Sequence, residues 1–281
     1  MSLLLREEGN SKPIAYISGG ELDGNIVYLK DDDEELSMSE TDSEDSYEDE
    51  YNDGDRENGF KRIKIRHGRM IPIPSAERFV KYIVGMSGSG KSTLISKIVN
   101  LYHKLYPHND IYLFSLKDYD PVFELFEKKG IIKRIILDET LLDIDPKNVV
   151  DANDNSLMIF DDVDSMAEIN PAIMRKINAV RKYIMELGRA ANVSIIIASH
   201  DINHIGMNRD FSRKVMNEMH DMTFFNKTAD PHQLEYCLTK YFKMTPNDIR
   251  ILKNYKRSRW TTISKQYPKY ILREKDCVMN C

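Results

Sequence analysis

The segment from residue 79 to residue 99 limits the possible folds of this chain more than any other. An apolar, β-rich run leads into a short loop rich in glycine and serine, and an apolar helical pattern follows the loop. The loop matches G-x-x-x-x-G-K-[ST], in which successive backbone N–H groups turn inward on an anion in conformations that a Cβ would hinder. The amino end of the following helix adds further amides. The nine loop residues are Gly85, Met86, Ser87, Gly88, Ser89, Gly90, Lys91, Ser92 and Thr93.

A strand before this loop and a helix after it favour a triphosphate-binding loop over an ordinary glycine-rich turn. In that arrangement Lys91 would reach the β- and γ-phosphates of ATP, and the Ser92 hydroxyl would bind Mg²⁺. We therefore expect the whole loop, as far as Thr93, to contact a nucleoside triphosphate.

Two carboxylates follow an apolar run about 70 residues after the loop. Residues 157–160 are apolar and lead directly into Asp161 and Asp162, a pattern typical of a buried parallel strand with acids at its carboxyl end. Asp161 is predicted to hold the Mg²⁺, directly or through water, and Asp162 to polarise the attacking water. A strand that ends in a solvated Asp-Asp turn is the alternative.

A third buried strand with a polar end is predicted at residues 193–201. Its apolar run ends in Ser199 and His200, either of which would lie beside the γ-phosphate as a sensor. A purely structural histidine is the alternative for His200. Between the second and third strands, Asn170 and Pro171 form a helix-start signal, and apolar residues three or four apart continue to Leu187.

Charge divides the chain into two predicted parts. Residues 1–57 contain 19 Asp or Glu and four Lys or Arg, whereas residues 58–281 carry a net charge of +10. We expect residues 1–57 to be an acidic, mostly disordered extension, although two β-like pieces within residues 12–30 are compatible with a hairpin. We expect residues 58–281 to form one ATPase domain that ends in a helix from Thr245 and a β-hairpin near Tyr267. Its basic charge favours a polyanionic partner.

The cysteines and the hydropathy pattern indicate the compartment. Cys237, Cys277 and Cys281 are odd in number and lack C-x-x-C spacing, which argues against disulfides or a zinc site and for a reducing environment. No apolar run approaches the length of about 18 residues that a membrane span needs. We expect a soluble, intracellular protein with no membrane partner.

The order of these elements, together with residues 187–200, resembles one family. The segment Leu-Gly-Arg-Ala-Ala-Asn-Val-Ser-Ile-Ile-Ile-Ala-Ser-His is similar to the FtsK/HerA-superfamily ATPases that pump DNA. It especially resembles the DNA-packaging ATPases of nucleocytoplasmic large DNA viruses (poxvirus/mimivirus type), over roughly residues 75–230. One difference is His200, which replaces the usual Gln and also resembles the switch histidine of ABC ATPases.

The resemblance implies an α/β fold, a P-loop NTPase three-layer sandwich with a mostly parallel central sheet and an additional strand between the Walker A and Walker B strands. It implies a Mg²⁺-dependent ATPase that forms a homo-oligomeric ring and translocates or packages double-stranded viral DNA. A capsid or portal protein is then a candidate partner, and the host cytoplasm or the virion is the location. Arg189 would be an arginine finger that completes a neighbour's site, with an ordinary helix-end cation as the alternative.

Two other functions remain open from the sequence. A P-loop kinase would transfer the γ-phosphate to a small molecule, and an ABC-like or switch-type protein would bind nucleotide with slow turnover. Kinases of that type usually lack the acidic pair and carry an arginine-rich lid, and no such lid is obvious here.

Overall fold

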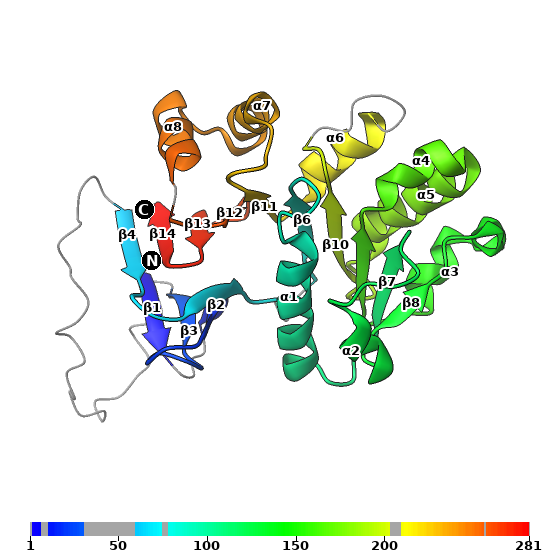
Figure 1. Cartoon of the computed structure of the whole chain (residues 1–281), viewed down its shortest axis with the longest axis horizontal. Helices are drawn as coiled ribbons and strands as arrows, with labels where there is room; N and C mark the ends of the chain where they lie inside the picture. The colour runs from blue at the N-terminus through cyan, green and yellow to red at the C-terminus, as the bar shows by residue number, and fades with distance from the viewer. Residues whose placement is uncertain are drawn as a thin grey trace.

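A mixed sheet forms the centre of the molecule (Figure 1). The computed structural model describes residues 2–6, 11–30, 60–74, 78–202, 209–255 and 257–280. Within these ranges ten strands lie in the order β4-β14-β13-β12-β11-β6-β10-β9-β7-β8. Their bounds are β4 Phe60–Lys64, β6 Val80–Val84, β7 Ile111–Ser115, β8 Lys133–Ile135, β9 Leu157–Asp161, β10 Ser194–Ser199, β11 Asp221–Phe225, β12 Trp260–Ser264, β13 Tyr270–Arg273 and β14 Asp276–Asn280.

The half of the sheet from β11 to β8 is parallel. β10 lies between β6 and β9, with Ala198 paired to Ile83 on one side and to Asp161 on the other. β6, β9 and β10 are buried along their whole lengths, because α1 (Lys91–Leu105) packs on one face and α5 (Pro171–Leu187) on the other. The predicted α/β class, its three layers and the additional strand between the two Walker strands are confirmed.

The helix α5 begins where the sequence predicts. The Asn170 side chain accepts hydrogen bonds from the backbone N–H groups of Ala172 and Ile173 (3.1 and 3.2 Å), and Pro171 occupies the first helical turn. No helix in the described ranges is both long and apolar enough to cross a lipid bilayer. The other helices are α2 Glu124–Lys128, α3 Pro146–Asp151, α4 Met166–Ile169, α6 Arg209–Glu218, α7 Pro231–Phe242 and α8 Pro246–Asn254.

Antiparallel strands extend the sheet beyond β11. β12 pairs with β11 and forms the predicted hairpin with β13. α8 begins after Thr245 as predicted and has a capping box, in which Asp248 N donates to Thr245 Oγ1 and Thr245 N donates to the Asp248 carboxylate (both 3.3 Å). The sequence did not predict α7, nor β14, which lies between β13 and β4.

A second, smaller sheet is built largely from residues of the predicted acidic extension. Its four strands are all antiparallel and lie in the order β1-β3-β2-β5, so that β2 pairs directly with β5. Their bounds are β1 Ser2–Arg6, β2 Lys12–Ser18, β3 Ile26–Lys30 and β5 Arg69–Pro72. The β2–β3 hairpin matches the pattern at residues 12–30. β2 and β3 are ordered because they bury their apolar side chains together with those of β5. Residues 31–57 lie outside the described residues.

The basic stretch at residues 60–72 is divided between the two sheets. β4 joins the large sheet and β5 joins the small one, with a turn at Gly68 between them. Gly68 has a φ of 72°, and a Cβ there would lie 1.9 Å from the Gly19 carbonyl oxygen. The two sheets are therefore joined by a turn that requires glycine.

Candidate active site

The loop from Gly85 to Thr93 connects β6 to α1 and has the backbone of a phosphate cradle. Gly88 and Gly90 adopt positive φ angles of 73° and 106°, which side chains with a Cβ rarely allow. At Gly85 the restriction is steric, because a Cβ would lie 2.6 Å from Ser89 Oγ and 3.0 Å from the Phe225 ring. Gly85 N donates to the Ser199 carbonyl (3.2 Å), which fixes the loop to the end of β10.

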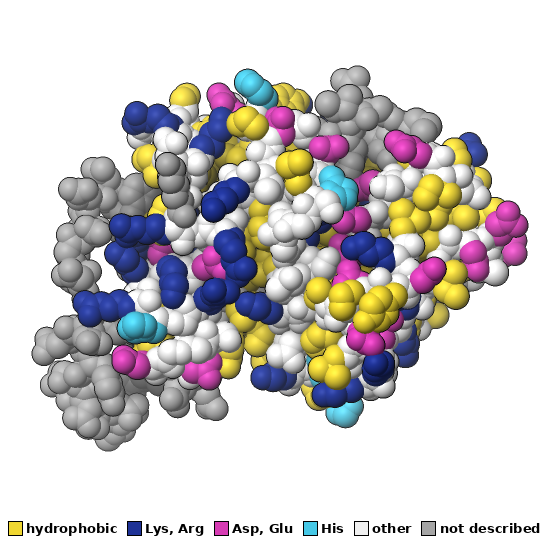
Figure 2. All heavy atoms as spheres, viewed as in Figure 1, with side chains coloured by type: hydrophobic (Ala, Val, Ile, Leu, Met, Phe, Trp, Pro, Cys, Tyr) yellow, Lys and Arg dark blue, Asp and Glu magenta, His cyan; other side chains and the backbone are white. Residues whose placement is uncertain are grey.

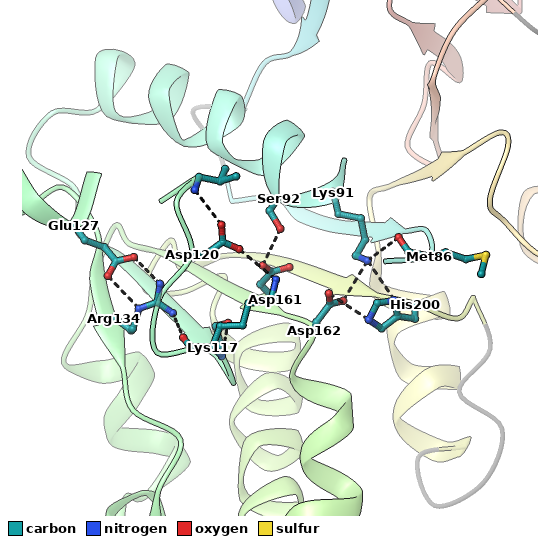
Figure 3. A network of polar contacts seen from close by, with 12 residues as sticks. Met86, Lys91, Ser92, Lys117, Asp120, Glu127, Arg134, Asp161, Asp162 and His200 are labelled. Atoms are coloured by element: carbon teal, nitrogen blue, oxygen red, sulfur yellow. Dashed lines mark hydrogen bonds and ion pairs between the residues drawn. The ribbon is translucent and has the colours of Figure 1, made fainter. Parts of the chain in front are cut away.

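The Lys91 ammonium is held inside this loop (Figure 3). Its side chain is 4% exposed, and Nζ donates to the Gly85 carbonyl oxygen at 2.7 Å. Asp162 Oδ1 lies 3.4 Å from the same Nζ. The ammonium is therefore positioned at the carboxyl edge of the sheet, between the loop and β9.

Asp161 and Ser92, the two residues that we expect to hold the metal, lie next to each other. Ser92 Oγ donates to Asp161 Oδ2 at 3.1 Å, whereas Asp161 Oδ1 is buried and has no hydrogen-bond partner. Burial, and secondly the neighbouring charge of Asp162, raises the pKa of Asp161 to about 6. A divalent cation would satisfy the free oxygen and favour the ionised carboxylate, and Mg²⁺ prefers such oxygen ligands. The residues present therefore fit Mg²⁺.

The second carboxylate lies toward the lysine and the histidine. Asp162 adopts a left-handed backbone conformation (φ 52°) just after β9, and its Oδ2 lies 3.3 Å from His200 Nε2. His200 Nδ1 lies 3.5 Å from Lys91 Nζ. Because lysine can only donate, Nδ1 accepts, and the hydrogen on Nε2 faces Asp162. The residues predicted from three separate segments therefore meet at one edge of the sheet.

A polar group that we did not predict extends this site. Lys117 follows β7, the strand next to β9, and its Nζ lies 3.4 Å from Asp120 Oδ2. The Lys117 charge contributes to lowering the pKa of Asp161, against the effects of burial and Asp162. The sequence signal was available, since residues 111–115 form an apolar strand followed within two residues by this lysine. The rule that located the aspartates would have located it.

Comparisons with known proteins were made on sequence and on structure. No protein-family model matches the chain. The uncharacterized protein V3 of Sputnik virophage is 32% identical over 268 residues, which cover 94% of this chain and 94% of that protein. The chain belongs to the V3 family.

Solved structures share the fold of this V3-family chain at low identity. The conjugation coupling protein TcpA of pCW3 has a TM-score of 0.51 and 12% identity, covering 93% of this chain and 76% of its own. The cytoplasmic domain of the type VII secretion ATPase EccC from Thermomonospora curvata has a TM-score of 0.52 and 13% identity, covering 77% and 28%. The genome packaging NTPase B204 of Sulfolobus turreted icosahedral virus 2 has a TM-score of 0.46 and 16% identity, covering 69% and 94%. The fold is that of the P-loop NTPases.

Arg189 lies away from the site in this V3-family chain. It is exposed and follows α5 in the turn that leads into β10, where Val193 N donates to the Gly188 carbonyl (2.8 Å). This turn is at the amino end of β10, whereas the loop and the aspartates lie at the carboxyl ends of their strands. Arg189 is close enough to Arg78, just before β6, to contribute to lowering the pKa of Arg78, after the larger effect of burial. It does not reach the site of its own chain, and its role in a neighbour stays a prediction.

Proposed function

We propose that this protein is a Mg²⁺-dependent ATPase. The observation that carries the proposal is the separation of the two adjacent carboxylates. Asp161 lies with Ser92, on the side that suits a metal ion, while Asp162 lies with Lys91 and His200, on the side that suits the γ-phosphate and its nucleophile. A site with one acid would bind nucleotide, and the second acid provides a base for water.

The residues of the chain have distinct parts in this hydrolysis. Lys91 Nζ would exchange the Gly85 carbonyl for phosphate oxygens, and Asp162 would orient the attacking water and accept its proton. His200 would hold Asp162 through Nε2. Mg²⁺, held by Ser92 and Asp161, would neutralise charge on the phosphate oxygens.

Phosphate release from ATP tests the proposal, with and without Mg²⁺. Lys91→Ala should lose triphosphate binding, because the fixed cation is removed. Asp162→Asn should bind ATP as the parent does but release phosphate at least about 100-fold more slowly, since an amide cannot take up the proton. Lys104→Met, an exposed change on the last turn of α1, is the control. Turnover by Asp162→Asn at the parental rate, or transfer of phosphate to a small acceptor in place of water, would contradict the proposal.

We further propose that the ATPase works as a homo-oligomeric ring that moves double-stranded DNA, as a packaging motor of the large-DNA-virus type. The net charge of +10 on residues 58–281 supports a polyanionic partner, and the distance of Arg189 from its own site supports a role for it in a neighbour. A capsid or portal protein would anchor the ring, in the host cytoplasm or the virion. Duplex DNA should stimulate phosphate release, and sedimentation should detect oligomers with ATP. A turnover rate that DNA leaves unchanged, or a monomer in the presence of ATP and DNA, would contradict this proposal.

A further inference from the structure

A cavity of about 50 Å³ lies at the edge of the sheet opposite to the phosphate loop. The residues just before β6 and β11, the turn between β12 and β13, and the start of β2 in the small sheet line this cavity. Because β6 and β11 are parallel, their first residues lie together at the amino edge, away from Lys91 and the two aspartates. Since one water molecule needs about 10–15 Å³ of such space, the cavity suits a compact ligand and not a nucleotide.

Three side chains that can carry positive charge line the cavity from different walls. Lys12 begins β2 of the small sheet, Arg78 precedes β6, and His220 precedes β11. Lys12 is exposed, while Arg78 and His220 are half-buried, so solvent reaches all three. Figure 2 shows Lys and Arg side chains gathered on the half of the molecule that holds the small sheet, and such a concentration of charge attracts anions.

Arg78 is fixed by backbone carbonyl groups. Its Nε donates to the Val193 carbonyl oxygen (3.1 Å), and its Nη2 donates to the carbonyl oxygens of Ile184 and Met185 near the end of α5 (2.8 and 2.7 Å). Burial lowers the pKa of Arg78, and the charge of Glu218 opposes that effect. A guanidinium that is already held in place loses little conformational entropy when it binds a ligand, and the N–H groups of Nη1 take no part in these three bonds.

The carboxylate that lines the cavity is already paired. Asp221 Oδ2 lies 2.5 Å from Lys81 Nζ, and the two side chains are 8% and 5% exposed. This buried pair is neutral as a whole. It therefore does not balance the charges of Lys12 and Arg78.

The pKa of His220 reflects the positive charge around the cavity. Burial lowers this pKa to about 4, and the charges of four cations add to that effect. In order of decreasing effect they are Arg78, Lys81, Lys12 and Arg189. The His220 imidazole is therefore uncharged at neutral pH, and an anion in the cavity would favour its protonation.

We propose that this cavity binds a single phosphate group, either free orthophosphate or the terminal phosphate of a nucleic-acid strand. The oxygens of a doubly charged phosphate point outward in several directions, which matches donors on three walls, whereas a carboxylate presents two oxygens in one plane. Lys12 Nζ, Arg78 Nη1 and the His220 ring would donate to these oxygens. Gln266 and Tyr270 are further donors on the lining. A phosphate within a strand carries a sugar on both sides, so only an end phosphate fits so small a space.

Calorimetric titration of orthophosphate into the full chain tests the proposal. The phosphate loop also accepts anions, so the parent of these titrations carries Lys91→Ala. Lys12→Met and His220→Gln should each weaken phosphate binding about tenfold, since each removes a hydrogen bond to a charged group. Lys64→Met, an exposed change on β4 outside the cavity, is the matched control and should leave the affinity unchanged. Arg78 is kept, because its removal would leave three carbonyl oxygens without their donor.

NMR of the histidine rings gives a second readout. The His220 signal is identified among the seven histidines of the chain by its loss in His220→Gln. Saturating orthophosphate should raise the pKa of His220 from about 4 toward the ordinary value of 6.5, because an anion favours the imidazolium form. Acetate at the same ionic strength should leave that pKa unchanged.

Two oligonucleotides, with and without a 5′-phosphate, distinguish the two sources of the phosphate. A strand end is the ligand if the 5′-phosphate tightens binding about tenfold and Lys12→Met removes that gain. Orthophosphate is the ligand if the oligonucleotides bind alike and Lys12→Met weakens only orthophosphate binding.

Three results would overturn the proposal. Lys12→Met and folded His220→Gln could bind orthophosphate as their parent does, or orthophosphate could leave the pKa of His220 unchanged. Equal weakening of both oligonucleotides by the two variants would assign the cations to phosphates within a strand. Because the parent of these titrations lacks Lys91, none of these results decides the ATPase proposal.

Discussion

The burial of Asp161 destabilises the metal-free protein more at neutral pH than at acidic pH. Its pKa rises from 3.8 to about 6, first because of burial and then because of Asp162. A raised carboxyl pKa means that ionisation favours the unfolded chain, so the penalty is absent below about pH 4 and complete above about pH 7. Two pKa units correspond to about 3 kcal/mol of unfolding free energy.

Replacing Asp161 by Asn should remove this penalty. The amide oxygen still accepts from Ser92, so we expect Asp161→Asn to raise the unfolding free energy by about 3 kcal/mol at pH 8 and by about half as much at pH 5, where most native molecules carry the protonated acid. Urea unfolding in EDTA at the two pH values measures the gain. Asp154→Asn, an exposed carboxylate shortly before β9, should change stability by less than about 0.5 kcal/mol at either pH.

Three results would each refute a part of this explanation. A gain that is the same at pH 5 and pH 8 would mean that the ionised carboxylate is not the source of the penalty. An Asn variant that Mg²⁺ stabilises as much as it stabilises the parent would mean that Asp161 is not a ligand. Equal gains with and without Asp162→Asn would also exclude the proposed contribution of the neighbouring charge.

Three more predictions follow from the geometry. Arg189→Ala should keep ATP binding and lose phosphate release, and mixing it with Lys91→Ala should restore activity in shared oligomers; no recovery in mixed oligomers shown to form would refute a trans role. Residues 31–57 carry 15 acidic residues and one basic residue. Replacing them by an uncharged linker of equal length should tighten DNA binding most near 0.01 M salt, where the screening length is about 30 Å. If fluorescence anisotropy gives equal DNA affinities for the two proteins, the segment serves solubility alone. Arg181 is fully buried, donates a hydrogen bond to Asp164 (3.1 Å), and its guanidinium lies 4.0 Å from the centre of the Phe211 ring. Arg181→Ala should therefore lower the unfolding free energy by about 3 kcal/mol or more. Urea unfolding measures this loss, with the exposed change Arg175→Ala as the control.

The parallel core was predictable because its signals are local. The phosphate loop, the acids after β9 and the Asn170 cap each lie within a few residues of the strand or helix that they define, and periodicity places them. The same locality explains why Asp161 and Asp162 could be assigned different roles before their contacts were known. Parallel strands bring their carboxyl ends to one edge, so polar residues there must meet.

The antiparallel half of the large sheet and the small sheet depend on contacts between residues that are distant in sequence. Asp276 is fully buried, yet Arg62, Arg273 and Tyr255 contact its carboxylate at 2.6, 3.3 and 3.1 Å. Arg273 is near Asp276 in the sequence, but Arg62 is 214 residues away, so the burial of Asp276 could not be inferred from its neighbours in the chain. The small sheet was missed for the same reason, because β2 pairs along its second edge with β5, which comes after residues 31–57 in the chain.

The position of β14 also determines when the fold can be completed. Its neighbour β4 is so distant along the chain that the Arg62–Asp276 pair joins residues 214 positions apart. As a ribosome releases the chain, β6, β9 and β10 emerge together with the helices that cover them, while β4 remains without its partner. Closing so long a loop is slow compared with local pairing. Joining β4 to β14 is therefore a late folding step, and it fastens the earliest part of the chain to a sheet that has already formed.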